Sequence, residues 1–240
     1  MEDGMDVAAA AAALPPPRAF TAVGVVADLD GTLIDSEPAY YASYAAVARE
    51  AGKEYSWEVH KHLLGRAEVE GARNMIALLQ LHGTTPEQLL HARDAHFVDT
   101  MAHLVPLEGA LELAQSISAR GLPAAIATSS SRKYLALKRA ANEPLFSCFH
   151  HFVCGDDAAV GGHSKPHPAI FIAGAEAIGV PAHQCVAFED SIAGVASAKA
   201  AGMFVVAIPD KRLNMHDLVA AAPDVILPSL RDFNWTCVGL

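Results

Sequence analysis

Short apolar runs that alternate with stretches of helical periodicity are the feature that most constrains how this chain folds. The first run, residues 22–27, is partly β-branched and ends abruptly in Asp28-Leu29-Asp30-Gly31-Thr32, as expected of a buried strand followed by a loop. Similar runs recur at residues 124–127, 152–154, 185–188, 204–208 and 225–227. Strands separated by helices predict an α/β fold with a doubly wound, mostly parallel sheet that is covered on both faces.

One long segment, residues 36–105, interrupts this alternation. It contains no convincing strand and has the periodicity of several amphipathic helices, one of which is expected to begin at Pro86, a residue favoured in the first helical turn. The α/β pattern then returns with a helix over about residues 110–120, which Gly121 is expected to end. The expected core therefore consists of residues 21–35 and 106–240, with a helical insertion between them.

Charge and cysteine content limit the partners and the setting of the chain. Of its 240 residues 52% are hydrophobic, which is enough for a sizeable core, and the formal net charge is −10. This charge would repel nucleic acid and anionic membranes, so neither is expected as a partner. The four cysteines are irregularly spaced without a Cys-x-x-Cys, which predicts no disulfide framework, no zinc site and a reducing, cytoplasmic location.

The first 20 residues differ from the rest in composition. They begin with acidic residues, continue with an alanine run and contain no lysine or arginine before Arg18, a pattern unlike secretory or transit peptides. We expect a disordered tail here. No later window offers the roughly 18 uninterrupted apolar residues that a membrane-spanning helix needs.

Carboxylate, hydroxyl and amine side chains follow the predicted strands or precede a helix. Asp28 and Asp30 follow the first strand, Thr128-Ser129-Ser130 follow the second, Lys165 precedes a helix, and Glu189-Asp190 follow a later strand. In an open α/β sheet, ligands bind outside the carboxyl ends of the strands. Four carboxylates gathered there would repel one another unless a cation lay between them. Their oxygen ligands indicate Mg²⁺.

Taken together and in this order, these four stretches resemble the motifs of the haloacid dehalogenase-like hydrolases, although a lone Asp-Gly-Thr is more often an ordinary turn. The resemblance covers essentially everything after residue 20 and implies a Rossmann-like core with an inserted helical cap that closes over the active site. It also implies a Mg²⁺-dependent phosphatase that acts on a small phosphate monoester, which we expect to be a monomer.

Each of these residues receives a role from the resemblance. Asp28 would be the nucleophile that becomes an aspartyl phosphate, and Asp30 would act first as the acid and then as the base. Lys165 would supply fixed positive charge. The remaining roles are phosphate binding by Thr128, Ser129 and Ser130, and Mg²⁺ binding by Asp28, Asp30, Asp190 and Glu189, with Gly31, Asp35 and Gly194 as positions of second rank.

Residues of the insertion distinguish the phosphatases of the family from its phosphosugar mutases. Where phosphosugar mutases of the β-phosphoglucomutase type have a cap histidine and arginine, this chain has Tyr40 and Glu68, which favours a phosphatase. Four other stretches resemble the branch of pseudouridine-5'-phosphatase and plant-type glycerol-3-phosphatase: residues 57–59, 64–66, 155–157 and 188–191.

Several assignments stay open at this point. Arg66 is a candidate substrate contact, because the guanidinium group can bind a phosphate or a polar base edge through two hydrogen bonds. A role as a surface charge at the end of a cap helix is an equally good interpretation. The twelve histidines lack metal-binding spacing and receive no metal. A β-phosphoglucomutase-like mutase and a non-catalytic phosphate-binding relative are the alternatives, whereas Asp30 speaks against a dehalogenase.

Overall fold

The computed structural model describes residues 5–101 and 103–240, so the first four residues of the predicted tail lie outside the described part. The strands are β1 (Gly24–Ala27), β2 (Ala124–Thr128), β3 (His151–Cys154), β4 (Cys185–Glu189), β5 (Phe204–Ala207) and β6 (Val225–Ile226). The helices are α1 (Val7–Ala13), α2 (Glu37–Glu50), α3 (Trp57–His60), α4 (Glu68–Leu79), α5 (Pro86–Met101), α6 (Ala110–Ala119), α7 (Arg132–Ala141), α8 (Glu143–Phe146), α9 (Ala169–Ala177), α10 (Ile192–Ala200) and α11 (Met215–Ala220). Short 3₁₀ helices span Ala158–Val160, Ala182–Gln184, Leu230–Asp232 and Trp235–Val238.

The six strands form one sheet in the order β3-β2-β1-β4-β5-β6, and every neighbouring pair is parallel. Each strand coincides with one of the apolar runs, so the predicted parallel α/β sheet is confirmed. The chain moves outward from β1 through β2 to β3 and then returns to place β4 on the other side of β1. The carboxyl ends of β1 and β4 therefore flank the point where the strand order reverses, which is where open α/β sheets bind ligands.

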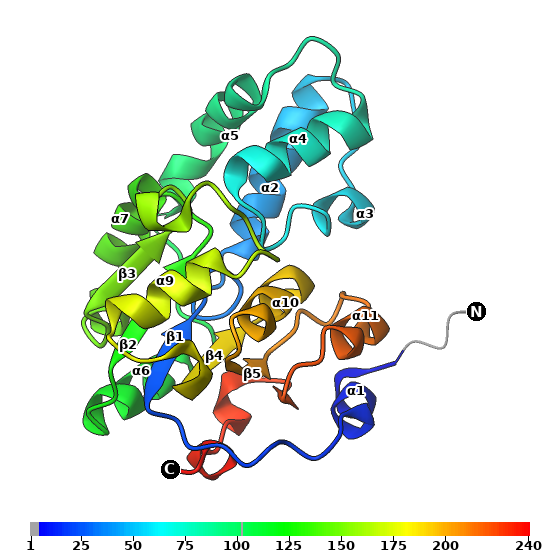
Figure 1. Ribbon diagram of the computed structural model, residues 1–240. Helices are drawn as coiled ribbons and strands as arrows, with labels where there is room; N and C mark the ends of the chain where they lie inside the picture. Colours follow the sequence, from blue (N-terminus) through cyan, green and yellow to red (C-terminus); the bar gives the residue numbers. More distant parts are fainter. Residues whose placement is uncertain (1–4, 102) are drawn as a thin grey trace.

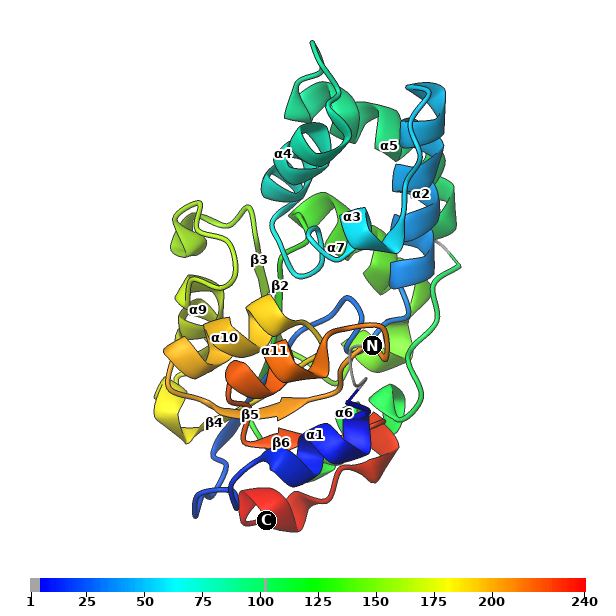
Figure 2. The same cartoon turned by 90° about the vertical axis from the view of Figure 1, so that its right-hand side faces the viewer.

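Helices cover both faces of the sheet, as Figure 2 shows. Val25 and Ala27 of β1 pack into a core with α6 and α8. Val26, which points to the opposite face as strand geometry requires, packs with α9, α10 and α11. Burial on both faces explains why the strands are continuous apolar runs without a polar alternation.

Helices α2 to α5 lie together at one end of the molecule, beyond the carboxyl ends of the strands (Figure 1). They surround a separate apolar cluster that includes Tyr44, Ala72, Met75 and Leu89. The end of α5 reaches the sheet, where Phe97 belongs to the same core as β1. Within the described residues, no helix is long and apolar enough to cross a membrane.

The amino-terminal segment differs from the predicted disordered tail. Its alanine run forms α1, which packs against α11 and β6, with Ala10 fully buried. Asp6 caps this helix by accepting a hydrogen bond from the backbone N–H of Ala9 at 2.8 Å. Alanine is the strongest helix former, and its small side chain permits close packing. An alanine run without an apolar pattern can therefore form a helix that packs on a neighbouring surface.

Candidate active site

The carboxyl ends of β1 and β4 bring three predicted site residues together. Asp28 follows β1, Glu189 is the last residue of β4 and Asp190 comes next. The two strands are hydrogen-bonded neighbours up to this point, since the N–H of Asp28 donates to the carbonyl of Phe188 at 2.9 Å. All three acidic side chains are buried. The sheet topology alone therefore juxtaposes residues that lie some 160 positions apart in the sequence.

Lys165, from the loop before α9, lies between two of these acids. Its Nζ is 2.5 Å from Oδ1 of Asp28 and 2.5 Å from Oε1 of Glu189, and the residue is 1% exposed. A buried lysine is costly unless it is paired. The pairing with two carboxylates satisfies that requirement, and it raises the pKa of the Lys165 ammonium even though burial alone would lower it.

Asp28, Glu189 and Asp190 form an acidic group that fits a hard cation. Each offers an oxygen atom, and these atoms lie within 4.8 Å of one another. Burial raises the pKa of Asp28 to about 7, against the opposing charge of Lys165. Burial and the neighbouring charges of Glu189 and Asp28 raise the pKa of Asp190 well above its usual value. Closely spaced, buried carboxylate oxygens of this kind suit Mg²⁺.

Two glycines make room for this acidic group. A Cβ on Gly194 would overlap the carboxylate of Glu189, and a Cβ on Gly31 would overlap that of Asp190. Gly31 also has a φ of +83°, which favours glycine. Both are among the positions that the sequence ranked second, and Asp35, the third of them, is exposed.

Asp30 points toward a different set of partners. Its carboxylate accepts hydrogen bonds from Ser36 at 2.7 Å, from Ser130 at 2.8 Å and from Thr128 at 3.1 Å, and it forms an ion pair with Lys138. Burial raises its pKa, but the charge and hydrogen bond of Lys138 outweigh that effect, so the pKa is lowered overall. The structure does not place the Asp30 carboxylate among the three acids that could share a cation.

Lys138 is a site residue that the sequence reasoning missed. It is fully buried on α7, and its Nζ donates to Oγ of Ser130 at 2.8 Å and to the hydroxyl of Tyr40 at 3.1 Å. A signal was present, because Lys138 follows Tyr134 and Leu135 on the buried stripe of that helix. A lysine on a buried helix face requires a partner.

The loop after β2 connects the sheet edge to the helical segment. Oγ of Ser129 donates to the carbonyl of Gly65 at 3.0 Å. Arg66, the candidate substrate contact, donates from Nη1 to the carbonyl of Lys165 at 3.1 Å and to Oε1 of Glu70 at 2.8 Å. Arg66 therefore lies at the site, but its described hydrogen bonds are to the protein.

A cavity of about 60 Å³ lies between the helical segment and the sheet edge. Asp28, Asp30, Ser129 and Ser130 line it from the sheet. Opposite them are Glu37, Tyr40, Tyr44, His60, Leu63, Leu64, Gly65, Arg66, Ala67, Glu68 and Gly71. The nucleophile and acid candidates thus share a space between the sheet edge and the inserted helices.

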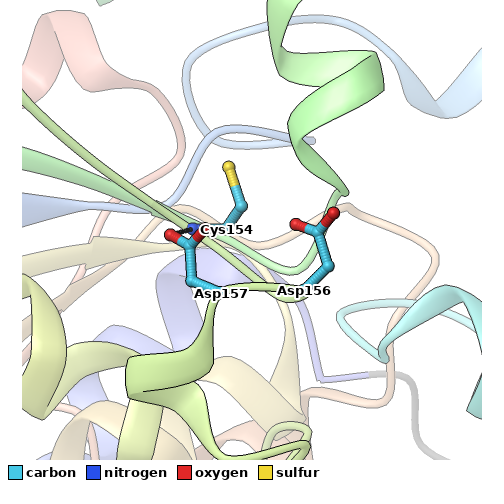
Figure 3. Close-up of side chains that lie close together, drawn as sticks. All are labelled: Cys154, Asp156 and Asp157. Atoms are coloured by element: carbon cyan, nitrogen blue, oxygen red, sulfur yellow. Dashed lines mark hydrogen bonds between the residues drawn. The ribbon is translucent and has the colours of Figure 1, made fainter.

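A second cluster, Cys154, Asp156 and Asp157, has metal-like spacing (Figure 3), but its carboxylates are already engaged. Asp157 binds the Arg132 guanidinium through two hydrogen bonds of 2.7 Å each. Asp156 accepts from the backbone N–H of Arg132 at 3.0 Å, at the start of α7. Burial also raises the pKa of the Cys154 thiol to about 12. This cluster fixes the start of α7, which carries Lys138.

A parallel sheet with a buried lysine between acids at its switch point, and an Asp-x-Asp pair facing a small cavity, is an arrangement suited to phosphoryl transfer on an α/β fold. The model of the haloacid dehalogenase-like hydrolases matches residues 23–202, and the chain belongs to this family. It is a phosphatase of phosphorylated small molecules.

Several individual proteins are similar to this chain. A "Probable pseudouridine-5'-phosphatase" of Drosophila melanogaster is 35% identical over 90% of this chain and 93% of its own length. "(DL)-glycerol-3-phosphatase 2" of Arabidopsis thaliana is 33% identical over 87% of this chain and 88% of its own length. The crystal structure of β-phosphoglucomutase from Clostridium difficile has a TM-score of 0.75 at 17% identity over 90% of this chain and 95% of its own. That last likeness concerns the fold alone.

Proposed function

We propose that this protein is a Mg²⁺-dependent phosphatase that hydrolyses a small phosphate monoester through an aspartyl phosphate on Asp28. The observation that carries the proposal is the position of Asp28, which lies 2.5 Å from Lys165, within an acidic group that fits a cation, and at the wall of the cavity that Asp30 also lines. A nucleophile, a fixed cation and an acid thereby face one small space.

The proposed reaction has two steps. A carboxylate oxygen of Asp28 bonds to phosphorus as the bond from phosphorus to the ester oxygen breaks, and the protonated Asp30 carboxyl gives its proton to the leaving alkoxide. Asp30 then takes a proton from a water molecule that attacks the phosphorus, which releases inorganic phosphate and restores the Asp28 carboxylate. The negative charge of a bound phosphoryl group opposes the effect of Lys138 on Asp30 and favours the protonated form needed first.

Mg²⁺ would be held by Asp28, Asp190 and Glu189, and when bound it supplies positive charge that offsets repulsion between carboxylate and phosphate. Lys165 holds the Asp28 carboxylate in place. Ser129 and Ser130, which line the cavity, and Thr128, beside Asp30, are the proposed phosphoryl contacts. Their hydroxyls and backbone N–H groups would exchange present partners for phosphate oxygens.

We further propose that residues 36–105 act as the cap domain of a core formed by residues 21–35 and 106–240. The separate apolar cluster of the helical segment supports this division, as do the contacts of Gly65 and Arg66 with the loops that carry Ser129 and Lys165. A cap that packs on its own can open for substrate and close to exclude water.

The names of the relatives suggest pseudouridine 5'-phosphate and glycerol 3-phosphate as substrates. A mutase activity is less compatible with Tyr40, whose hydroxyl is already 3.0 Å from Oγ of Ser130 and 3.1 Å from Nζ of Lys138. A non-catalytic role is disfavoured because Asp28, Asp30 and Asp190 are all retained in buried or partly buried positions, where unused carboxylates would only cost stability.

Phosphate release from a panel of esters tests the proposal. The panel contains pseudouridine 5'-phosphate, glycerol 3-phosphate, flavin mononucleotide and β-glucose 1-phosphate, each with Mg²⁺ and with a chelator. We expect Mg²⁺-dependent release from at least one ester and none from the Asp28→Asn variant. Conversion of β-glucose 1-phosphate to its isomer would indicate a mutase, and failure with every ester would indicate a non-catalytic protein.

A further inference from the structure

The cavity has an acidic wall on the side of the helical segment. Glu37 of α2 and Glu68 of α4 both line it, across from the residues of the sheet edge. The leaving group of an ester whose phosphoryl group lies at Asp28 would be directed toward this wall. These two carboxylates are therefore placed to contact the leaving group, and the charge of Glu37 also contributes to the raised pKa of Asp190.

Glu68 has an unused acceptor. Its Oε1 is buried and accepts no hydrogen bond from the described residues, and its Oε2 lies 3.7 Å from Nη2 of Arg93. Burial raises the pKa of Glu68, and the charge of Arg93 acts in the opposite direction. A buried acceptor without a donor costs free energy that a hydroxyl group of a ligand would recover.

Glu37 is fixed by His60. Oε2 of Glu37 lies 2.9 Å from Nε2 of His60, and Nδ1 of the same ring lies 2.8 Å from the hydroxyl of Tyr55. The carboxylate can only accept, so Nε2 carries the proton and donates to Glu37. This arrangement holds the carboxylate at the cavity wall, with Oε1 receiving no hydrogen bond from the part of the chain that the structure describes.

The basic side chains around this cavity have acidic partners. Arg93, whose Nη2 lies 3.7 Å from Glu68, also pairs with Asp94, although its buried Nε has no hydrogen-bond partner among the described residues. Arg66 donates to Glu70 at 2.8 Å, Lys138 pairs with Asp30, and Lys165 pairs with Asp28 and Glu189. A second anionic group on the substrate would therefore meet carboxylates at the wall with no free lysine or arginine among the described lining residues.

We propose that Glu37 and Glu68 make the enzyme select an uncharged leaving group with additional hydroxyl donors, and make it reject leaving groups that carry a carboxylate or a second phosphate. This inference rests on the proposed phosphatase function. It names the chemistry of the leaving group, which the phosphoryl site itself leaves undetermined. Like charges brought together in a desolvated site cost enough to discriminate between such substrates.

The test compares two esters of equal carbon number, glycerol 3-phosphate and 3-phosphoglycerate, with p-nitrophenyl phosphate as a generic third ester. For the wild-type chain with Mg²⁺ we expect kcat/KM to be about tenfold or more higher for glycerol 3-phosphate than for 3-phosphoglycerate. Glu68→Gln keeps the shape and removes the charge, so this ratio should fall about tenfold, mostly through faster turnover of 3-phosphoglycerate. Glu37→Gln should act in the same direction.

The matched control is Glu58→Gln, which changes a carboxylate of the same helical segment whose side chain is 74% exposed, and it should leave the ratio unchanged. Hydrolysis of p-nitrophenyl phosphate without a preference between the two test esters in the wild type would overturn this inference and leave the proposed function intact. An unchanged ratio in both Gln variants would also overturn it. Absence of turnover with all three esters would contradict the proposed function and the inference together.

Discussion

Nζ of Lys165 lies 2.5 Å from Oδ1 of Asp28, and both side chains are almost completely buried. Glu189, on the far side of the same ammonium group, and Asp190 add two further buried acids. The positive charge of Lys165 thus offsets the negative charge of three closely spaced carboxylates. Its removal has consequences for stability as well as for chemistry.

Lys165→Met should destabilise the Mg²⁺-free protein by about 3–5 kcal/mol, because it leaves buried carboxylates without their cation. Urea unfolding in chelator measures this change. Lys61→Met is the control, since Lys61 forms an exposed pair with Glu58 that should contribute at most about 1 kcal/mol. Equal effects of the two substitutions would show that Lys165 does not hold the acidic group together.

Lys138→Met should lower kcat by about tenfold to a hundredfold, because Asp30 loses its ion pair and the position needed for proton transfer. The Mg²⁺ concentration for half-maximal activity should stay unchanged, since Lys138 contacts Asp30, Ser130 and Tyr40 and not the three acids. Lys133→Met is the control on the same helix, with a side chain that is 59% exposed. A large shift in the Mg²⁺ requirement of Lys138→Met would contradict the separation of the two clusters.

Mg²⁺ should stabilise the folded protein against heat, by about 2.7 kcal/mol at a concentration one hundred times its Kd. Asp190→Asn should abolish this stabilisation and should also raise the melting temperature in chelator, because it removes one of several buried like charges. Differential scanning calorimetry with and without Mg²⁺ measures both effects. Glu176→Gln, an exposed carboxylate on α9, should change neither.

The buried thiols should be unreactive in the folded protein. Burial raises the pKa of Cys154 and of Cys185 to about 12, which leaves roughly one thiol in ten thousand ionised at pH 8. Iodoacetamide at that pH should label the partly exposed Cys148 and Cys237 well before the buried pair. Peptide mass spectrometry identifies the labelled cysteines. Early labelling of Cys154 would show that β3 is not packed as described.

The sequence predicted those parts of the molecule that depend on local pattern. Each of the six apolar runs became a strand because a strand buried on both faces needs consecutive apolar residues, and helix α5 begins at the expected Pro86. Asp28 and Asp190 could be placed at one sheet edge because parallel strands align their carboxyl ends there.

The rest depends on contacts between distant segments. Lys138 reaches Asp30 across 108 positions, and only the packing of α7 against the sheet determines which acid it meets. The engagement of Arg66 with Glu70 and with the carbonyl of Lys165 likewise depends on how the helical segment seats on the core. Helix α1 orders because α11 and β6 offer it a surface, which an alanine run does not reveal.

The central claim is that Asp28 becomes phosphorylated, and acid quenching during turnover of a ³²P-labelled ester, followed by peptide mapping, tests it most directly. We expect label on the peptide that contains Asp28, released by mild alkali as expected of an acyl phosphate, and no label in Asp28→Asn. Label on another residue such as Ser129, or wild-type phosphate release by Asp28→Asn, would contradict it.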